Sequence, residues 1–185
     1  MNHDINTALS RLFQDAFDKS GRDSFSTSFD PEWRSECEIS QSGDQTSWYP
    51  KRQEVPVNFA GLANAVGANI HPDICAYYGS FWAGTLESTS QEGRVSLIQL
   101  WNHEDFDRLI ANLIGHFMAK QRIKQPFTAF FANTEPDSEL FLSIDNVSGQ
   151  VLLEDPSKPP LRIVEQDLAT FLNRLTPVTI EAGIY

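Results

Sequence analysis

Two glutamates, Glu36 and Glu38, have the spacing that could support acid–base chemistry. They lie two positions apart in a segment expected to be a strand, so both side chains would point to the same face. A glycosidase uses such a pair of carboxylates, and His116 could add a proton-transfer group. The alternative is a solvated strand face, because charged residues are mostly exposed. A small hydrolase therefore requires all three side chains to meet in one pocket.

We expect no metal site, no cofactor and no catalytic residue. His103 and Asp107 are one helical turn apart and could hold a metal. Two ligands on one turn without further ligands are weak evidence for a metal site, however, and the two side chains can simply pair with each other. Cys37 and Cys75 are too far apart in sequence for a metal motif, and they form no disulfide framework. The sequence has no HExxH, GxSxG, GKS/T or glycine-rich phosphate-loop motif, so nothing favours an enzyme.

Acidic residues outnumber basic residues by 25 to 14, which gives a formal net charge of −11. The excess lies toward the two ends, because residues 1–50 carry nine acids and four bases and residues 136–185 carry eight acids and three bases. Such a field repels nucleic-acid phosphates and anionic lipid head groups. It would attract a basic protein surface and speed association with it. Simple solubility is the alternative explanation.

Aromatic residues occur in short runs along the chain. Tryptophan and tyrosine are enriched at the energetic centres of protein interfaces. Most of these residues are expected in the core, but any that lie on an uncovered sheet face would anchor a partner. The runs are Trp48-Tyr49, Tyr77-Tyr78 and Phe81-Trp82, with Trp101 standing alone.

The apolar spacing predicts two long amphipathic helices, over residues 5–17 and 103–120. Gly115 in the second helix is expected to allow a close approach to the sheet. Three cations near the end of this helix would complement its dipole rather than bind lipid. They are Lys120, Arg122 and Lys124.

Shorter elements connect these helices. Turn residues predict antiparallel hairpins over 37–49 and 83–101 and a three-strand meander over 128–154. Further helices are expected over 72–79 and 164–175, and residues 22–35 are expected to be a loop. Because strands and helices are grouped rather than strictly alternating, the predicted fold class is α+β. We expect a mainly antiparallel sheet of about six strands with helices packed on one face and function on the other.

The chain is expected to be a single domain over residues 1–185. Residues 1–34 would be a helix plus loop extension, and residues 176–185 would be a loose C-terminal tail. The first residues lack the pattern of a signal peptide, and no apolar run approaches the ~20 residues that span a bilayer. We therefore expect a cytosolic protein without direct lipid insertion.

Three consecutive stretches closely resemble the SecY-interacting protein Syd family of Gram-negative bacteria. They are Asn112-Leu113-Ile114-Gly115-His116, then Lys120-Gln121-Arg122 with Lys124-Gln125, and Phe127-Thr128-Ala129-Phe130-Phe131-Ala132. Further similar segments include Ser47-Trp48-Tyr49-Pro50, Ile70-His71-Pro72-Asp73-Ile74, Gln99-Leu100-Trp101-Asn102, Asp145-Asn146-Val147-Ser148-Gly149 and Leu168-Ala169-Thr170-Phe171-Leu172. The ordered set covers most of residues 35–177. Departures are the first 30 residues, the last ten, and Trp82-Ala83-Gly84-Thr85, where Thr85 stands in place of an acidic residue.

The resemblance implies a non-enzymatic protein that binds the cytosolic face of the SecY translocon channel and acts as a regulator or quality-control factor. It implies a peripheral place on the cytoplasmic side of the inner membrane, and SecY loops there are basic under the positive-inside rule. The family belongs to the SUKH superfamily, so the alternative is an immunity protein that neutralises a basic toxin. The candidate partner-binding residues are Glu36, Glu38, Trp48, Glu54, Tyr77, Tyr78, Glu87 and Asp145. The stretch Asn112 to His116 is expected to be scaffold.

Overall fold

The strands of the chain pair into one large sheet and two small sheets. The computed structural model describes residues 2–135 and 137–178, with side chains from residue 4 onward. The helices are α1 (Asn2–Ser20), α2 (Ala60–Val66), α3 (Pro72–Tyr78), α4 (His103–Arg122) and α5 (Leu168–Asn173). The large sheet contains β6 (Leu86–Ser90), β7 (Gly93–Leu97), β8 (Thr128–Asn133), β9 (Phe141–Asp145), β10 (Val151–Glu154), β11 (Arg162–Glu165) and β12 (Thr176–Pro177). The small sheets contain β1 (Phe25–Ser28), β2 (Glu38–Ser42) and β3 (Gln45–Trp48), and β4 (Lys51–Arg52) with β5 (Phe81–Trp82).

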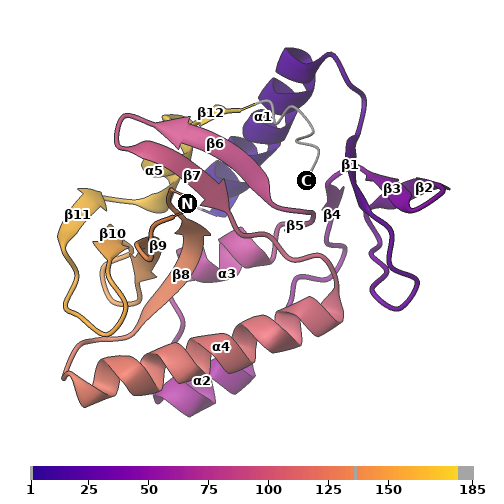
Figure 1. The fold of residues 1–185 in the computed structure, drawn as a ribbon. Helices are drawn as coiled ribbons and strands as arrows, with labels where there is room; N and C mark the ends of the chain where they lie inside the picture. Colours follow the sequence, from indigo (N-terminus) through magenta and orange to yellow (C-terminus); the bar gives the residue numbers. More distant parts are fainter. Residues whose placement is uncertain (1, 136, 179–185) are drawn as a thin grey trace.

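The large sheet has seven strands in the order β11-β10-β9-β8-β7-β6-β12 (Figure 1). Every neighbouring pair in it is antiparallel. The hairpin β6–β7 and the meander β8–β9–β10 match the predicted strands because their connections are rich in turn residues. The predicted α+β fold class with a mainly antiparallel sheet is therefore confirmed.

The two faces of the sheet differ in chemistry, because cross-strand partners point to the same side. One face is apolar and buried, and its central residues are Leu86, Leu97, Ala132 and Leu142. The opposite face is polar and aromatic. We call five of its partly or fully exposed residues the open face, namely Glu87, Ser96, Phe130, Asn133 and Phe141.

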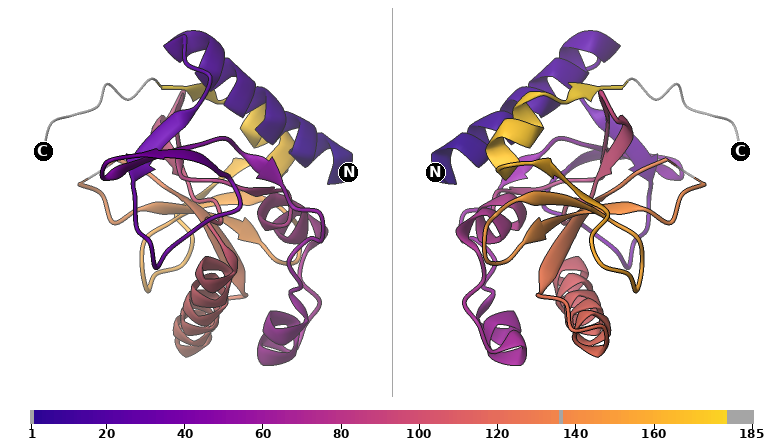
Figure 2. Two further views of the ribbon diagram at one scale, coloured as in Figure 1. Left: turned by 90° about the vertical axis from the view of Figure 1, so that its right-hand side faces the viewer. Right: turned by 90° about the vertical axis from the view of Figure 1, so that its left-hand side faces the viewer.

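Helices α1, α3 and α5 pack around the apolar face. The ring of Phe131 on β8 lies edge-on to Tyr77 of α3 and Phe171 of α5, at centroid distances of 5.5 and 5.8 Å. The Arg11 guanidinium of α1 donates a hydrogen bond to the Leu172 carbonyl of α5 at 2.9 Å. Figure 2 shows α1 on one side of the sheet and α4 with α2 on the other. Helix α4 therefore lies on the side of the polar face, near one end of it.

The N-terminal strands form their own sheet in the order β1-β3-β2. It is joined to the body by aromatic contacts, since the ring of Phe17 on α1 lies 4.5 Å from Phe25 of β1 and stacks on Tyr49 at 4.9 Å. Residues 22–35 were expected to be a loop. This expectation is wrong for Phe25–Ser28, which form the strand β1 because they pair with β3.

Two predictions for the C-terminal region also need correction. The helix predicted over 164–175 begins only at Leu168, because residues 162–165 pair with β10 as β11. The predicted loose tail is partly ordered, since Thr176 and Pro177 pair with Thr89 and Ser88 of β6. Residues 179–185 of that tail lie outside the described residues.

Candidate functional site

The three side chains of the hydrolase hypothesis do not meet. Glu36 precedes β2 and pairs with Lys51 at 2.9 Å, whereas Glu38 lies in β2 and forms an ion pair with Arg34. The prediction that the two glutamates share one exposed strand face is wrong, because the Glu38 side chain is only 3% exposed. His116 lies on α4, where its Nε2 contacts the Thr128 hydroxyl at 2.8 Å. Each residue thus has a separate partner.

Tyr77 and Tyr78 were predicted to contact a partner, and this is wrong. Both belong to α3 and are buried, with exposed fractions of 0% and 1%. The Tyr78 hydroxyl donates to the Phe130 carbonyl at 2.7 Å, so its polar end is satisfied inside the protein. Burial raises the pKa of both phenols above the ordinary value, which keeps them neutral. These tyrosines hold β8 against α3.

The acidic candidates lie in three separate places. Glu36 and Glu54 are both exposed and lie near Lys51, whose pKa is raised by the hydrogen bond from its ammonium to Glu36 and, to a smaller extent, by Glu54. Glu87 lies on the open face and accepts a hydrogen bond from Ser96 at 2.7 Å. Asp145 is half-buried at the far end of β9 and accepts bonds from the backbone N–H groups of the following turn.

Trp48 and Glu87, which are far apart in the sequence, line the same groove. Trp48 is 4% exposed, and it forms the floor of a groove between the N-terminal sheet and the start of β6. Glu87 lines one chamber of this groove, together with Trp48 and Thr85. The sequence identified both residues as candidates but could not predict that they lie close together, because nothing in the local sequence indicates that residues 48 and 87 share a surface.

A buried polar network joins α4 to the sheet, and sequence analysis missed it. Lys120 of α4 and Glu154 of β10 form an ion pair with exposed fractions of 2% and 1%. The Glu154 carboxylate also accepts hydrogen bonds from the hydroxyls of Thr128, at 2.6 Å, and Ser143. Lys120 therefore does not belong to a surface cluster of cations. Nothing in the sequence around Lys120 indicates this pairing, since Glu154 lies in another segment.

His116 completes this network from the same helix. Because the Thr128 hydroxyl donates to Glu154, its oxygen accepts from His116, so Nε2 carries the proton. Burial lowers the pKa of His116 below its ordinary value. The ring also lies edge-on to Phe130 and Phe141 of the open face, at 5.9 and 5.6 Å. These contacts support the expectation that His116 is scaffold.

Gly115 does not have the role expected of it. It is exposed, and a methyl group added there would meet no atom within 4 Å. The helix therefore does not approach the sheet through this residue.

In the described part of the chain, no three histidine, cysteine or acidic side chains gather as a metal site would require. Among the described helices, none is both long and apolar enough to cross a membrane.

The fold and these surfaces define a single α+β domain with an open sheet face and a groove that combines aromatic and acidic side chains. A family model described as "Syd protein (SUKH-2)" matches residues 6–177. The chain belongs to this Syd family. It is 34% identical to Protein Syd of Pseudoalteromonas atlantica over 170 residues, which are 90% of this chain and 91% of that protein. It is 37% identical to Protein Syd of Alteromonas mediterranea over 152 residues, 81% and 83% of the two chains. The corresponding protein of Psychromonas ingrahamii is 35% identical over 154 residues, 83% of each chain.

Proposed function

We propose that this chain is a non-enzymatic protein that binds the basic cytosolic loops of the SecY translocon channel. It works from the cytoplasmic side of the inner membrane as a regulator or quality-control factor of SecY, with a soluble cytosolic pool. The observation that carries the proposal is membership of the Syd family over residues 6–177, together with the SecY-interacting role that the resemblance implies.

The charge distribution supports a basic partner. Among the described residues, seven of the 14 basic side chains form ion pairs with carboxylates of the same chain, and the chain as a whole keeps a formal net charge of −11. These seven are Arg11, Arg34, Lys51, Arg94, Lys120, Lys158 and Arg174. The cytosolic loops of an inner-membrane protein are enriched in lysine and arginine. Complementary charge of this kind mainly speeds association and selects the partner.

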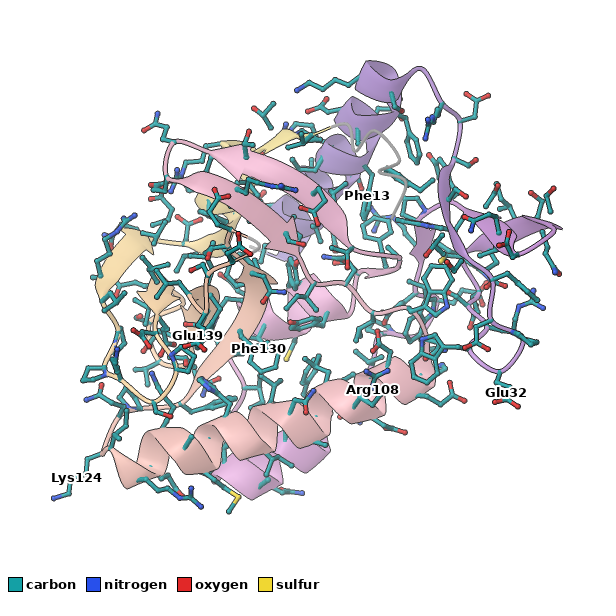
Figure 3. All side chains as sticks on the ribbon, in the orientation of Figure 1. Phe13, Glu32, Arg108, Lys124, Phe130 and Glu139 are labelled. Atoms are coloured by element: carbon teal, nitrogen blue, oxygen red, sulfur yellow. The ribbon has the colours of Figure 1, made fainter. Side chains whose placement is uncertain are left out.

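Within this proposal, the contact residues are the exposed or groove-lining members of the candidate set. They are Glu36, Trp48, Glu54, Glu87 and Asp145, and Glu38 contributes through its pairing with Arg34. Membrane association then needs no lipid contact. Lys120 is buried and only Arg122 and Lys124 remain exposed at the end of α4, where Figure 3 shows Lys124 directed away from the body. Two cations contribute only about 2 kcal/mol at an anionic surface.

Flotation tests this proposal directly. The purified protein is mixed with vesicles that contain SecY or with protein-free liposomes rich in anionic lipid, at physiological salt. We expect it to float with the SecY vesicles alone. Equal recovery with both kinds of vesicle would contradict the proposal and point to lipid binding through Arg122 and Lys124.

The alternative is an immunity protein that neutralises a basic toxin, which the SUKH-2 description of the family keeps open. An acidic surface would suit either partner. Co-purification distinguishes the two, because a SecY-binding protein is recovered from the membrane fraction with SecY, whereas an immunity protein is recovered with a soluble effector.

A further inference from the structure

Three tryptophans line one chamber of the groove described above, which we call the tryptophan chamber. It has a volume of about 340 Å³, and its walls include Trp33, Trp48 and Trp101. The rings come from three separate parts of the chain, namely the loop before β2, strand β3 and the segment that precedes α4. This volume is sufficient for one long side chain of a partner.

The rings are held in place before any partner arrives. Trp48 meets Trp101 edge-on at a centroid distance of 5.9 Å, and the Trp101 indole N–H donates to the Trp33 carbonyl at 2.8 Å. Gly84 is required for this arrangement, since a methyl group there would lie 2.7 Å from the Trp48 ring. A rigid aromatic site binds without the entropic cost of ordering its own side chains.

The chamber is suited to a cation rather than to a neutral apolar group. Asp30 lines it and is exposed, and its carboxylate forms no ion pair within the part of the chain that the structure describes. Trp33 also binds a cation already, because the Arg108 guanidinium of α4 lies 5.0 Å from the centre of its ring. Figure 3 shows Arg108 on α4 beside the loop that carries Glu32. Tryptophan is the best aromatic partner for a cation.

A second chamber continues from the first, and the two share Ser26, Trp48 and Thr85. It has a volume of about 270 Å³ and is lined by one acid, Glu87, and one base, Arg22. An extended segment could therefore lie along β1 with one long side chain in the tryptophan chamber and a neighbour near Glu87. The charged residues that line the two chambers are thus two acids, Asp30 and Glu87, and one base, Arg22.

We propose that the tryptophan chamber binds an arginine side chain of an extended basic segment in the partner protein. The guanidinium lies over an indole face and donates to the Asp30 carboxylate, while the aliphatic stem packs on Trp48. Arginine is favoured over lysine because its planar head stacks on aromatic rings as well as binding carboxylates. This inference rests on the proposed function, since it takes the partner to be basic, and it assigns the specificity to a site outside the open face.

The first experiment needs no partner protein. The four tryptophans of the chain give four indole N–H resonances in a ¹H–¹⁵N spectrum, and substitution of Trp33 and Trp101 by phenylalanine assigns two of them. N-acetyl-arginine amide is titrated into the wild-type protein, with N-acetyl-glutamine amide as the neutral control. We expect saturable shifts of the Trp33 and Trp101 resonances with the arginine compound alone. Shifts that are absent, or equal for both compounds, would overturn the inference.

The second experiment uses SecY vesicles and two matched variants. Asp30→Asn removes the chamber's carboxylate, whereas Glu32→Gln neutralises an exposed acid of the same loop that does not line the chamber. We expect Asp30→Asn to weaken binding about three- to tenfold and Glu32→Gln to change it less than about twofold. Equal weakening by both variants would mean that only general charge matters and would contradict the inference. If the wild-type protein binds no SecY vesicles, the proposed function fails, while the arginine titration still decides the chamber.

Discussion

The Lys120 ammonium on α4 donates a hydrogen bond to the Glu154 carboxylate on β10, and both side chains are almost completely buried. The two residues are 34 positions apart, and they tie the long helix to the polar face of the sheet. Thr128, Ser143 and His116 surround the pair, so that the carboxylate is satisfied by several donors. Burying two charges is costly unless they are paired and hydrogen-bonded. The position of α4 therefore depends on this network.

Removal of one partner should be strongly destabilising. Lys120→Met leaves Glu154 buried without its cation, and we expect the free energy of unfolding to fall by about 3–5 kcal/mol. Arg122→Met is the matched control, because Arg122 is exposed two positions away on the same helix, and it should change the stability by less than about 0.5 kcal/mol. Urea denaturation of both variants measures the difference. Equal stability of the two variants would show that the network does not hold α4.

The stability should also fall as the pH drops through the range in which histidine titrates. Burial lowers the pKa of His116, so the native protein keeps it neutral while the unfolded chain takes up a proton near its ordinary pKa of about 6.5. The unfolded state then binds more protons, and the stability declines below about pH 6.5 by at most about 1.4 kcal/mol per pH unit. His116→Gln retains an N–H donor toward Thr128 and should flatten the profile. An unchanged profile in this variant would assign the pH dependence to other groups.

A second pH dependence belongs to Glu92 at the β6–β7 turn. Hydrogen bonds from the Arg174 guanidinium lower the pKa of this carboxyl to about 2. Because the folded pKa is depressed, its stabilisation is complete above about pH 4.5 and is lost as the pH falls toward 2. The side chains of Arg174 and Glu92 are 24% and 32% exposed, so solvent screening limits the effect and we expect Glu92→Gln to cost about 1 kcal/mol at neutral pH. Thermal unfolding of the variant and the wild type should converge near pH 2, and a constant difference would contradict this account.

The sequence predicted those elements whose pattern repeats within one segment. Helices α1 and α4 span 19 and 20 residues, so several turns repeat the same apolar spacing. Strands β11 and β12 span four and two residues and exist because they pair with β10 and β6. Such pairing is not local, and a few residues carry too little periodicity to indicate it.

The candidate site was less predictable for the same reason. Lys120 has the position of a helix-capping cation, and its burial depends on Glu154 in another segment. Tyr77 and Tyr78 have a composition typical of an interface, but their helix faces the sheet interior. Local sequence indicates what a side chain can do, whereas the tertiary fold decides whether it meets solvent.

Association with SecY should slow as salt is added. The acidic candidates act on a basic partner over distances that salt screens within about 8 Å at physiological ionic strength. We expect the association rate measured with SecY vesicles to fall clearly from low to high salt, while the dissociation rate changes less. Glu87→Gln should reduce the salt dependence, because this acid lies on the open face and lines the groove. A rate that does not respond to salt would argue against an electrostatic encounter.

Two glycine substitutions should have opposite effects on stability. Gly115 lies in the middle of α4 with open space around it, so Gly115→Ala removes the conformational cost of glycine in a helix and should stabilise the protein by up to about 1 kcal/mol. Gly84→Ala places a methyl group against the rigid Trp48 ring, at 2.7 Å before any shift, and should destabilise by about 1–3 kcal/mol. Thermal unfolding measures both changes. Because Trp48 must move in the second variant, the arginine titration of the indole resonances should weaken there and remain unchanged in Gly115→Ala. Loss of stability in Gly115→Ala would show that α4 packs more closely at this point than the structure indicates.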